Sequence, residues 1–265
     1  MLPVFFACWQ MSASAAAPLE RVAQLIYGNE CASRTACLTS WNRGEEFASL
    51  GIGHFIWYPS GRTDADKPFR ESFPALLGYF AARGEPLPGW LMHADGCPWP
   101  NRKAFLAAQA SPRMFTLRAL LIRSMPLQAA FMRQRQDQAL PAMLQAAPPG
   151  LREHIARQYR SVAASPMGAY VLTDYVNFKG EGTKISERYH GQGWGLMQVL
   201  SVMPEVQAGP DAIRAFARAA DKMLSRRVLN APSARHEERW LPGWRKRLAS
   251  YPAEAAREMH GKLQP

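Results

Sequence analysis

The amino-acid sequence lacks any apolar run that could cross a membrane. No stretch approaches the roughly eighteen consecutive apolar residues of a transmembrane helix, so we expect no membrane-spanning segment. The chain also lacks a P-loop and a GxGxxG pattern, and no Ser-His-Asp order can be argued from it. Neither CxxC nor HExxH occurs among its 265 residues, so the sequence predicts no metal and no other cofactor.

Acidic residues are few relative to basic ones. There are 21 Asp and Glu residues against 32 Lys and Arg, which gives a net charge of +11 at pH 7. Such a charge favours an anionic partner: a nucleic acid, an acidic lipid or an acidic cell-wall polymer. No nucleic-acid recognition motif is present, so we expect no nucleic-acid partner. With 48% apolar and 20% charged residues the chain is typical of a folded globular protein, and we expect a monomer.

Cysteine is scarce as well, with four residues in the chain. Cys31 and Cys37 could close a short disulfide loop in an oxidising compartment, although spacing does not settle which of Cys31, Cys37 and Cys97 stays unpaired. Residues 1–17 combine an apolar core with a small-residue stretch, which resembles a secretory signal peptide without its positive first region. We therefore expect export to the periplasm or the extracellular space. A buried N-terminal segment is the alternative.

The rest of the chain has mostly helical periodicity. Residues 18–30 place their apolar side chains on one face and predict a helix. Short apolar runs at 38–58, with Gly44 at the turn, predict a β-hairpin. Capping residues and periodicity predict further helices at 101–109, 111–124, 128–147, 151–165 and 210–229. The predicted fold class is mainly α (α+β) with a small N-terminal β-hairpin subdomain, in one domain over residues 18–265.

The first constellation with chemical meaning is Glu30 followed by the hairpin that ends in the sequence SLGIGH. A carboxyl group at a helix end beside a small sheet can lie in a cleft, where an apolar environment helps it to retain a proton. Gly51 and Gly53 would let a polymer approach the backbone without interference from Cβ.

This order of helix, glutamate, hairpin and GIGH resembles the phage-type lysozymes. The resemblance implies that Glu30 is the general acid and that Ser49 takes the place of the family's threonine. The family's second carboxylate falls near Asn42 and Arg43, which are not acidic, so Glu45 or Glu46 on the turn would have to replace it. We take Glu46 as the candidate. His54 is a candidate substrate contact, and we expect a structural, hydrogen-bonded histidine there rather than a general base.

The second constellation lies at residues 174–204, where polar residues lead into a glycine-rich run. The segment GLMQ followed by MP resembles the soluble lytic transglycosylases, in which a catalytic glutamate precedes it by about the interval that separates Glu181 from Gly195. The run RYHGQGWGLMQ also resembles plant-type chitinases and related endolysins. These resemblances imply a lysozyme-like fold, Glu181 as a catalytic residue, and substrate contacts from the residues Tyr189, Gln192, Trp194 and Gln198. A glycine-rich helix junction without a ligand is the alternative.

Two tryptophans are candidates for stacking on sugars, because flat apolar rings suit the C–H faces of a sugar. Trp57 lies beside the hairpin and Trp194 lies in the glycine-rich run. The basic segment 232–248 could contact acidic groups, but a solvated basic face packed by tryptophans explains it as well.

The motifs together predict a glycosidase that cleaves β-1,4 bonds between N-acetylated sugars of peptidoglycan, as a muramidase or a lytic transglycosylase. Our hypothesis is that Glu30 and Glu181 face each other across one cleft and supply the paired carboxylates of such an enzyme. The alternative for Glu30 is a solvated carboxylate at a helix end. The alternative function is a non-catalytic protein that binds cell-wall glycan through a lysozyme-like fold.

Overall fold

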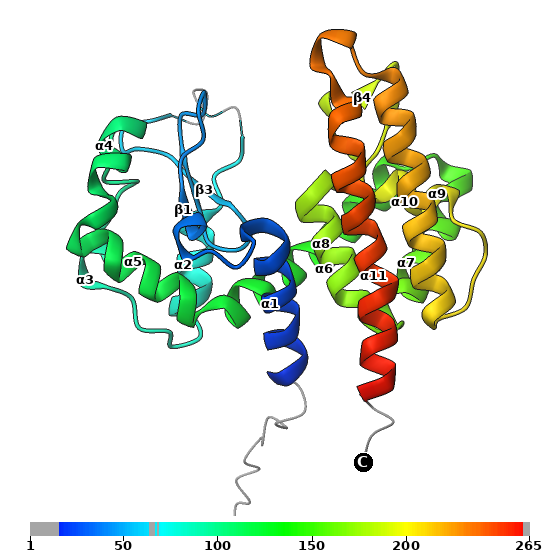
Figure 1. Ribbon diagram of the computed structural model, residues 1–265, viewed down its shortest axis with the longest axis horizontal. Coiled ribbons are helices and arrows are strands. Elements are labelled where there is room, and N and C mark those ends of the chain that lie inside the picture. Colours follow the sequence, from blue (N-terminus) through cyan, green and yellow to red (C-terminus); the bar gives the residue numbers. More distant parts are fainter. Residues whose placement is uncertain (1–15, 64–66, 68, 262–265) are drawn as a thin grey trace, which may run out of the picture. The chain divides into compact units, whose positions relative to one another are not determined.

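The computed structural model describes residues 16–63, 67 and 69–261 and contains many helices with a small antiparallel sheet (Figure 1). The prediction of a mainly α fold with a small β-hairpin element is therefore confirmed. Within the described ranges, no helix is both long enough and apolar enough to cross a bilayer. The predicted signal segment falls on residues 1–17, of which 1–15 lie outside the described residues.

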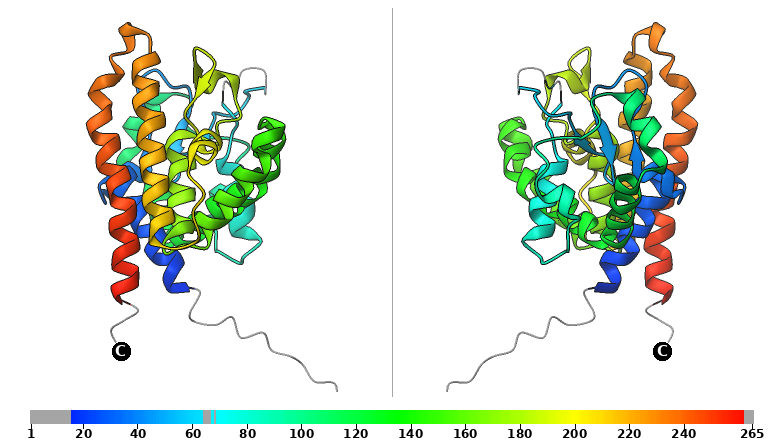
Figure 2. Two further views of the ribbon diagram at one scale, coloured as in Figure 1. Left: turned by 90° about the vertical axis from the view of Figure 1, so that its right-hand side faces the viewer. Right: turned by 90° about the vertical axis from the view of Figure 1, so that its left-hand side faces the viewer.

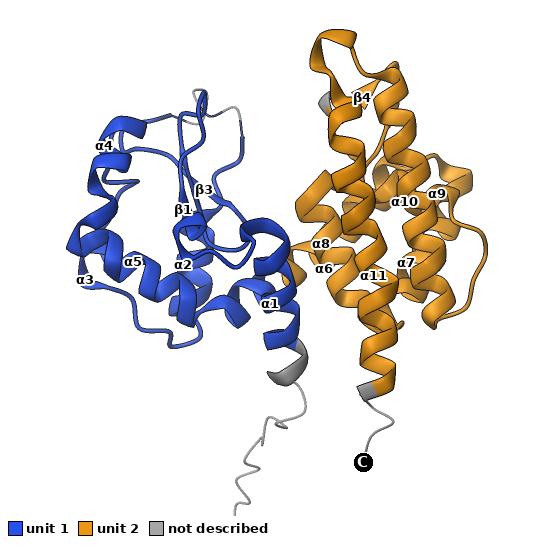
Figure 3. Ribbon diagram, in the orientation of Figure 1, with its two compact units in different colours: residues 1–131 blue, residues 132–265 orange. Residues whose placement is uncertain are grey.

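The chain divides into two compact units, residues 1–131 and residues 132–265 (Figure 3). The boundary falls inside the long helix α6 (Met125–Ala146). The prediction of a single domain over residues 18–265 stays a prediction.

Unit 1 begins with helix α1 and continues into the sheet and a group of short helices. Two of its helices, α4 and α5, start at side-chain caps: Asn101 accepts a hydrogen bond from the backbone N–H of Ala104, and Ser111 accepts one from the backbone N–H of Met114. The predicted helices at 18–30, 101–109 and 111–124 are confirmed. The elements are α1 (Ala16–Cys31), η2 (Thr35–Leu38), β1 (Thr39–Ser40), β2 (Ala48–Leu50), β3 (Phe55–Trp57), α2 (Phe73–Ala81), α3 (Gly89–Met92), α4 (Arg102–Ala107), η4 (Ala108–Ala110) and α5 (Pro112–Arg123).

The sheet of unit 1 has the order β1-β2-β3, with antiparallel pairing throughout. Ser49 in the middle strand pairs with Ser40 on one side and with Ile56 on the other. The turn between β1 and β2 contains Gly44 at φ +84°, a left-handed conformation that glycine adopts without strain. The predicted hairpin and its turn residue are therefore confirmed, and β3 extends the hairpin to three strands.

Unit 2 consists of helices and one small hairpin. The predicted helices at 128–147, 151–165 and 210–229 are confirmed. Helices α10 and α11 lie side by side along their length (Figure 1 and Figure 2). After α6 the elements are η5 (Pro149–Leu151), α7 (Arg152–Ala163), α8 (Gly168–Lys179), η6 (Ile185–Glu187), β4 (Arg188–Tyr189), β5 (Gln192–Gly193), α9 (Leu196–Val202), α10 (Pro210–Asn230), η7 (Ser233–Arg235), η8 (Glu237–Trp240) and α11 (Leu241–Gly261).

The hairpin of β4 and β5 was not expected from the sequence. Its two-residue turn consists of His190 and Gly191, which have φ values of 49° and 73°. Two successive left-handed residues are typical of the tight turns whose twist matches that of an antiparallel pair. The glycine density of this segment therefore does produce a tight turn, and the turn joins two strands.

A buried ion pair fastens α8 to α11 inside unit 2. Asp174 on α8 is fully buried and accepts hydrogen bonds from the Nε and a terminal nitrogen of Arg247 at 2.8 and 2.7 Å. The hydroxyl of Tyr251 donates a third, at 2.7 Å. Burial, followed by the charge of Asp174, raises the pKa of Tyr251 well above its ordinary value, so this hydroxyl remains a donor.

We predict that Arg247→Met lowers the free energy of unfolding by about 3–5 kcal/mol, because it leaves the carboxylate of Asp174 buried without its cation. Urea unfolding measures the change. The matched control is Arg245→Met, which removes an arginine that pairs with Asp221 at the surface and should cost less than about 1 kcal/mol. Equal losses in the two variants would contradict the assignment.

Candidate functional site

The end of α1 carries Glu30 and is held by a disulfide. Glu30 is half-buried and is followed by Cys31, which is bonded to Cys37 in η2. The pairing that the sequence left open is thereby settled as Cys31 with Cys37. Ala32 and Ser33 take left-handed backbone conformations with φ of 46° and 55°, and such conformations commonly end a helix. The disulfide therefore fixes the direction in which the chain leaves the residue next to Glu30.

The GIGH loop between β2 and β3 is anchored by a buried glutamine. The side-chain oxygen of Gln128 accepts a hydrogen bond from the backbone N–H of Ile52 at 2.9 Å, and its nitrogen donates to the carbonyl of Leu121 at 2.7 Å. A Cβ atom on Gly51 would lie 2.2 Å from that oxygen, and Gly51 has φ +69°.

These contacts give Gly51 a structural role. Glycine is required there by a neighbouring side chain of the same unit and by the backbone conformation, and its predicted substrate contact stays a prediction. Gly53 is half-buried, and its predicted substrate contact stays a prediction.

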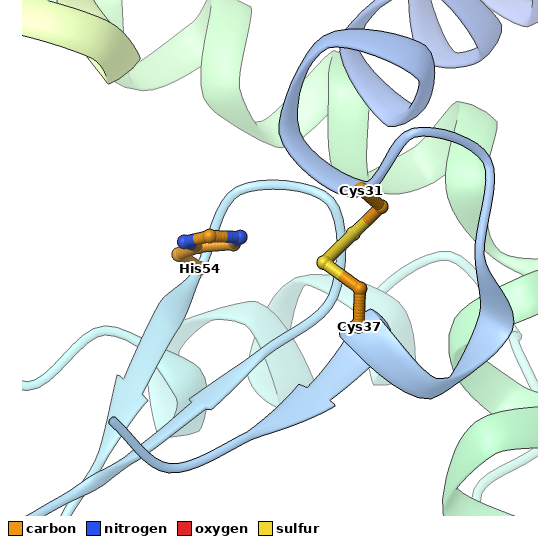
Figure 4. A group of neighbouring side chains, drawn as sticks. All are labelled: Cys31, Cys37 and His54. Carbon is orange, nitrogen blue, oxygen red and sulfur yellow. A yellow bond between two sulfur atoms is a disulfide. The ribbon is translucent and has the colours of Figure 1, made fainter. Parts of the chain in front are cut away.

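His54 brings the GIGH loop to the end of α1. One of its ring nitrogens and the two sulfur atoms of Cys31 and Cys37 all lie within 4.8 Å of one another (Figure 4). The Nε2 atom is buried and finds no hydrogen-bond partner in the described part of the chain. His54 is therefore not the fully hydrogen-bonded structural histidine that was one of the two expectations. The loop and the residue after Glu30 are brought together within unit 1, as the first motif predicts.

The turn between β1 and β2 carries the two glutamates that were expected to replace the second carboxylate. The side chain of Glu46 is 58% exposed and accepts a hydrogen bond from Arg62 at 2.6 Å. Glu45 is half-buried: one oxygen accepts from Asn42 at 3.1 Å, and the other is buried without a hydrogen-bond partner in the described ranges. A catalytic role of Glu46 stays a prediction.

Two further candidates of unit 1 are buried. Trp57 is 1% exposed, with its ring centroid 4.9 Å from that of Phe73. It belongs to the aromatic core under the sheet and cannot stack on a sugar from this position, which corrects the expectation. Ser49 is buried in the middle strand, where its carbonyl accepts a hydrogen bond from the Ser40 hydroxyl, so little of it is accessible to a substrate.

The glycine-rich segment of unit 2 is a close backbone junction at the start of α9. The carbonyls of Gly180 and Glu181 accept hydrogen bonds from the N–H groups of Leu196 and Met197, each at 3.0 Å. These carbonyls therefore satisfy donors that the first turn of a helix otherwise leaves free. The backbone of Glu181 thus lies beside the GLMQ segment, and its predicted catalytic role stays a prediction.

Three glycines in this junction have no room for a side chain. A Cβ on Gly182 would lie 2.0 Å from the side-chain oxygen of Gln198, and one on Gly195 would lie 2.2 Å from the nitrogen of Gly182. A Cβ on Gly193 would lie 2.8 Å from Gln198 as well. The side-chain nitrogen of Gln198 donates to the carbonyl of Gly182 at 2.9 Å. Gln198 therefore holds the junction together, and a substrate contact from it stays a prediction.

Two carboxylates of this segment have different surroundings. Glu181 is half-buried, and no side-chain hydrogen bond to it is found among the described residues. Glu187 accepts a hydrogen bond from the backbone N–H of Gly182 at 3.3 Å. Burial raises the pKa of Glu187 above its ordinary value, against the opposing charge of Lys184. Glu187 is thus the carboxyl group of this segment that burial helps to keep protonated.

Two of the remaining candidates of unit 2, Tyr189 and Trp194, pack around the ion pair of a buried glutamate. Glu237 is 5% exposed and accepts hydrogen bonds from Arg227 at 2.6 and 2.9 Å and from the hydroxyl of Tyr189 at 2.7 Å. The guanidinium of Arg227 also lies 4.1 Å from the centroid of the Trp194 ring. Burial raises the pKa of Glu237, but the hydrogen bonds from Arg227 and Tyr189 outweigh it and hold this pKa below the ordinary value.

Trp194 is 6% exposed, and Arg227 and Tyr189 pack against its ring. The expectation that a sugar stacks on Trp194 is therefore corrected as well, because so little of the ring is exposed. Tyr189 is half-buried, and Gln192 is exposed and accepts a hydrogen bond from Asn230 at 3.1 Å.

No protein-family model, curated protein or solved structure matches this chain. The resemblance to the phage-type lysozymes and the lytic transglycosylases therefore rests on the motifs and stays a prediction.

Sequence reasoning missed the cluster around Glu237. The segment 232–248 was expected to be either a ligand contact or a solvated basic face, and Glu237 lies within it as a buried acid. A buried partner for Arg227 has no local signature, since the two residues come from α10 and η8 and meet only in the folded unit.

We predict that Arg227→Met raises the pKa of Glu237 above the ordinary value of about 4.3, because burial is then opposed only by the hydrogen bond from Tyr189 and the charge of Lys179. In the wild type this pKa is lowered, so the stabilisation from the pair is present above pH 4.3 or so and is lost as the pH falls toward the folded-state pKa. The loss of stability in the variant should therefore be largest near neutral pH and should shrink in acid.

Carbon NMR of the glutamate carboxyl groups gives the pKa, and urea unfolding at pH 7 and pH 4 gives the stability. Arg239→Met is the control, because Arg239 is exposed and lies in the same segment as Glu237. An unchanged titration of Glu237 in the Arg227 variant would show that the ion pair does not govern it.

Proposed function

We propose that this protein cleaves β-1,4 bonds between the N-acetylated sugars of peptidoglycan, with Glu30 as the general acid. The observation that carries the proposal is the meeting of two motif elements within unit 1. The GIGH loop reaches the end of α1 through His54, whose ring lies beside the cysteine that follows Glu30.

The position of Glu30 suits proton donation to a leaving oxygen. A general acid must be accessible to its substrate and must also be partly shielded from water. Glu30 is half-buried at the end of a helix, and the disulfide at the next residue limits the freedom of the backbone there. A polymer could therefore reach the carboxyl group of Glu30, while the disulfide restrains the backbone that carries it.

The second half of the reaction depends on which group activates water. An inverting hydrolase needs a base about 6.5–9.5 Å from the acid. Glu46, in unit 1, and Glu181, in unit 2, are the candidates that the sequence offers for this base. Without a base in reach, a hydroxyl of the sugar itself can close a ring and give an anhydro product, which is the outcome of a lytic transglycosylase.

The charge of the chain fits a wall polymer as substrate. A net charge of +11 attracts the protein to an anionic cell wall and raises its local concentration there. The disulfide between Cys31 and Cys37 is the kind of bond that persists in an oxidising compartment. Export to the periplasm or beyond is accordingly part of the proposal.

We predict that Glu30→Gln lowers the rate of glycan cleavage about 10²–10⁴-fold, because glutamine cannot donate the proton that the leaving group needs. The assay is mass spectrometry of soluble products from purified peptidoglycan. Glu20→Gln is the matched control, since Glu20 is an exposed glutamate of the same helix and its loss should leave the rate unchanged.

The same assay, with Glu46→Gln and Glu181→Gln added, separates the possible reactions. Reducing ends indicate a hydrolase, and anhydro ends indicate a transglycosylase. A large loss in one of these two variants identifies the partner of Glu30. Absence of cleavage by the wild type, with peptidoglycan still pelleting the protein, would overturn the enzymatic proposal in favour of a glycan-binding protein.

A further inference from the structure

Cys31, Cys37 and His54 form a compact group of nitrogen and sulfur ligands in unit 1. They come from three different elements: the end of α1, the helix η2 and the loop between β2 and β3 (Figure 4). The two sulfur atoms and one imidazole nitrogen all lie within 4.8 Å of one another. Two sulfurs and one imidazole are the donor set that zinc prefers in proteins.

The geometry is close to that of a tetrahedral zinc site. With Zn–S bonds of about 2.3 Å and a Zn–N bond of about 2.0 Å, neighbouring ligand atoms lie about 3.5–3.8 Å apart. Opening the disulfide lets the sulfurs separate to that distance, and the imidazole has to approach by only about an ångström. A fourth position would remain for water or another ligand, as in zinc sites with three protein ligands.

His54 supplies an independent reason to expect a ligand. Its Nε2 atom is buried and has no hydrogen-bond partner among the described residues. Its backbone also takes a left-handed conformation, with φ 48°, which is uncommon for residues other than glycine. Buried polar atoms are nearly always paired in folded proteins, so the Nε2 of His54 has a free capacity for a ligand, and one of the two ring nitrogens lies near both sulfurs.

We propose that reduction of the Cys31–Cys37 disulfide converts this group into a binding site for one zinc ion, with His54 as the third ligand. A dithiol reductant transfers two electrons and two protons to the pair and leaves as its own disulfide. The two thiols then lose two protons as they bind Zn²⁺ as thiolates. The bound unit of one Zn²⁺, two thiolates and a neutral imidazole carries no net charge.

The two sulfurs differ in how a reductant can reach them. Cys31 is buried, whereas Cys37 is half-buried, so attack is expected at the sulfur of Cys37. Cys97 is the free cysteine of the described residues, and it is buried. Burial raises the pKa of the Cys97 thiol to about 12, so it does not supply a competing thiolate at neutral pH.

The sequence predicted no metal, and the reason is its spacing. Cys31 and Cys37 are six positions apart, outside the short spacings by which structural zinc sites are recognised. His54 joins them only because the hairpin folds back toward α1. The site does not depend on the proposed glycosidase activity, and its test uses no glycan.

The test is a titration of the full chain with Co²⁺ and then Zn²⁺, before and after reduction with a phosphine that is removed without admitting oxygen. We expect the reduced protein to bind one Co²⁺ per chain with a thiolate-to-cobalt charge-transfer band, which Zn²⁺ abolishes. The oxidised protein should show no such band. Circular dichroism of the reduced protein shows whether unit 1 remains folded.

Two histidine variants make the titration specific. His54→Asn should weaken Co²⁺ binding by the reduced protein at least tenfold, since it removes a ligand, and asparagine tolerates the left-handed backbone. His190→Asn is the matched control: His190 is exposed, has φ 49° and should leave binding unchanged. Failure of the reduced wild type to bind, folded or not, or equal binding by the His54 variant, would overturn the proposal.

Discussion

The arrangement of unit 1 depends on one buried amide, the side chain of Gln128. Through Ile52 it holds the GIGH loop, and through Leu121 it holds the end of α5. Because every polar atom of such a buried amide must be paired, the loop has few alternatives once α5 and α6 are formed. Gly51 is the counterpart of this contact, since any larger residue would collide with the amide oxygen. The first glycine of the GIGH motif is therefore needed for the folding of unit 1, whether or not a substrate binds there.

Unit 2 uses the same device at its own glycine-rich segment. Gln198 bonds the carbonyl of Gly182, and the neighbouring glycines approach so closely that side chains are excluded. In both units the side-chain amide of a glutamine fills the space beside a glycine and holds the backbone there. Gln128 holds the GIGH loop, and Gln198 holds the turn that follows Glu181. A glycine-rich motif beside a glutamate is thus a good indicator of a rigid backbone. It is a weaker indicator of direct contact between those glycines and a polymer.

Local signals predicted much of the fold, and long-range contacts account for what they missed. The caps at Asn101 and Ser111 and the turn at Gly44 act within a few residues, so the sequence displays them directly. The hydrogen bond from Ile52 to Gln128 spans 76 positions, and no local pattern announces it. The sequence predicted that Trp57 and Trp194 stack on sugars. Both rings are buried, and their burial depends on packing against segments that are distant in the sequence. For the same reason Glu237, within a basic run, could not be recognised as a buried ion-pair partner.

The two roles proposed for the end of α1 require opposite oxidation states of one pair of cysteines. A glycosidase benefits from the disulfide, because it restrains the backbone next to Glu30 and keeps the imidazole of His54 free of metal. A zinc site requires the disulfide to be open. Outside the cell the disulfide persists, whereas a reducing compartment favours thiols. Since the zinc-bound group would carry no net charge, its effect on Glu30 would come from the changed path of residues 31–37 and not from electrostatics. The surroundings of Glu30 would thus have one shape while Cys31 and Cys37 are reduced and bind zinc, and another shape after the disulfide has formed.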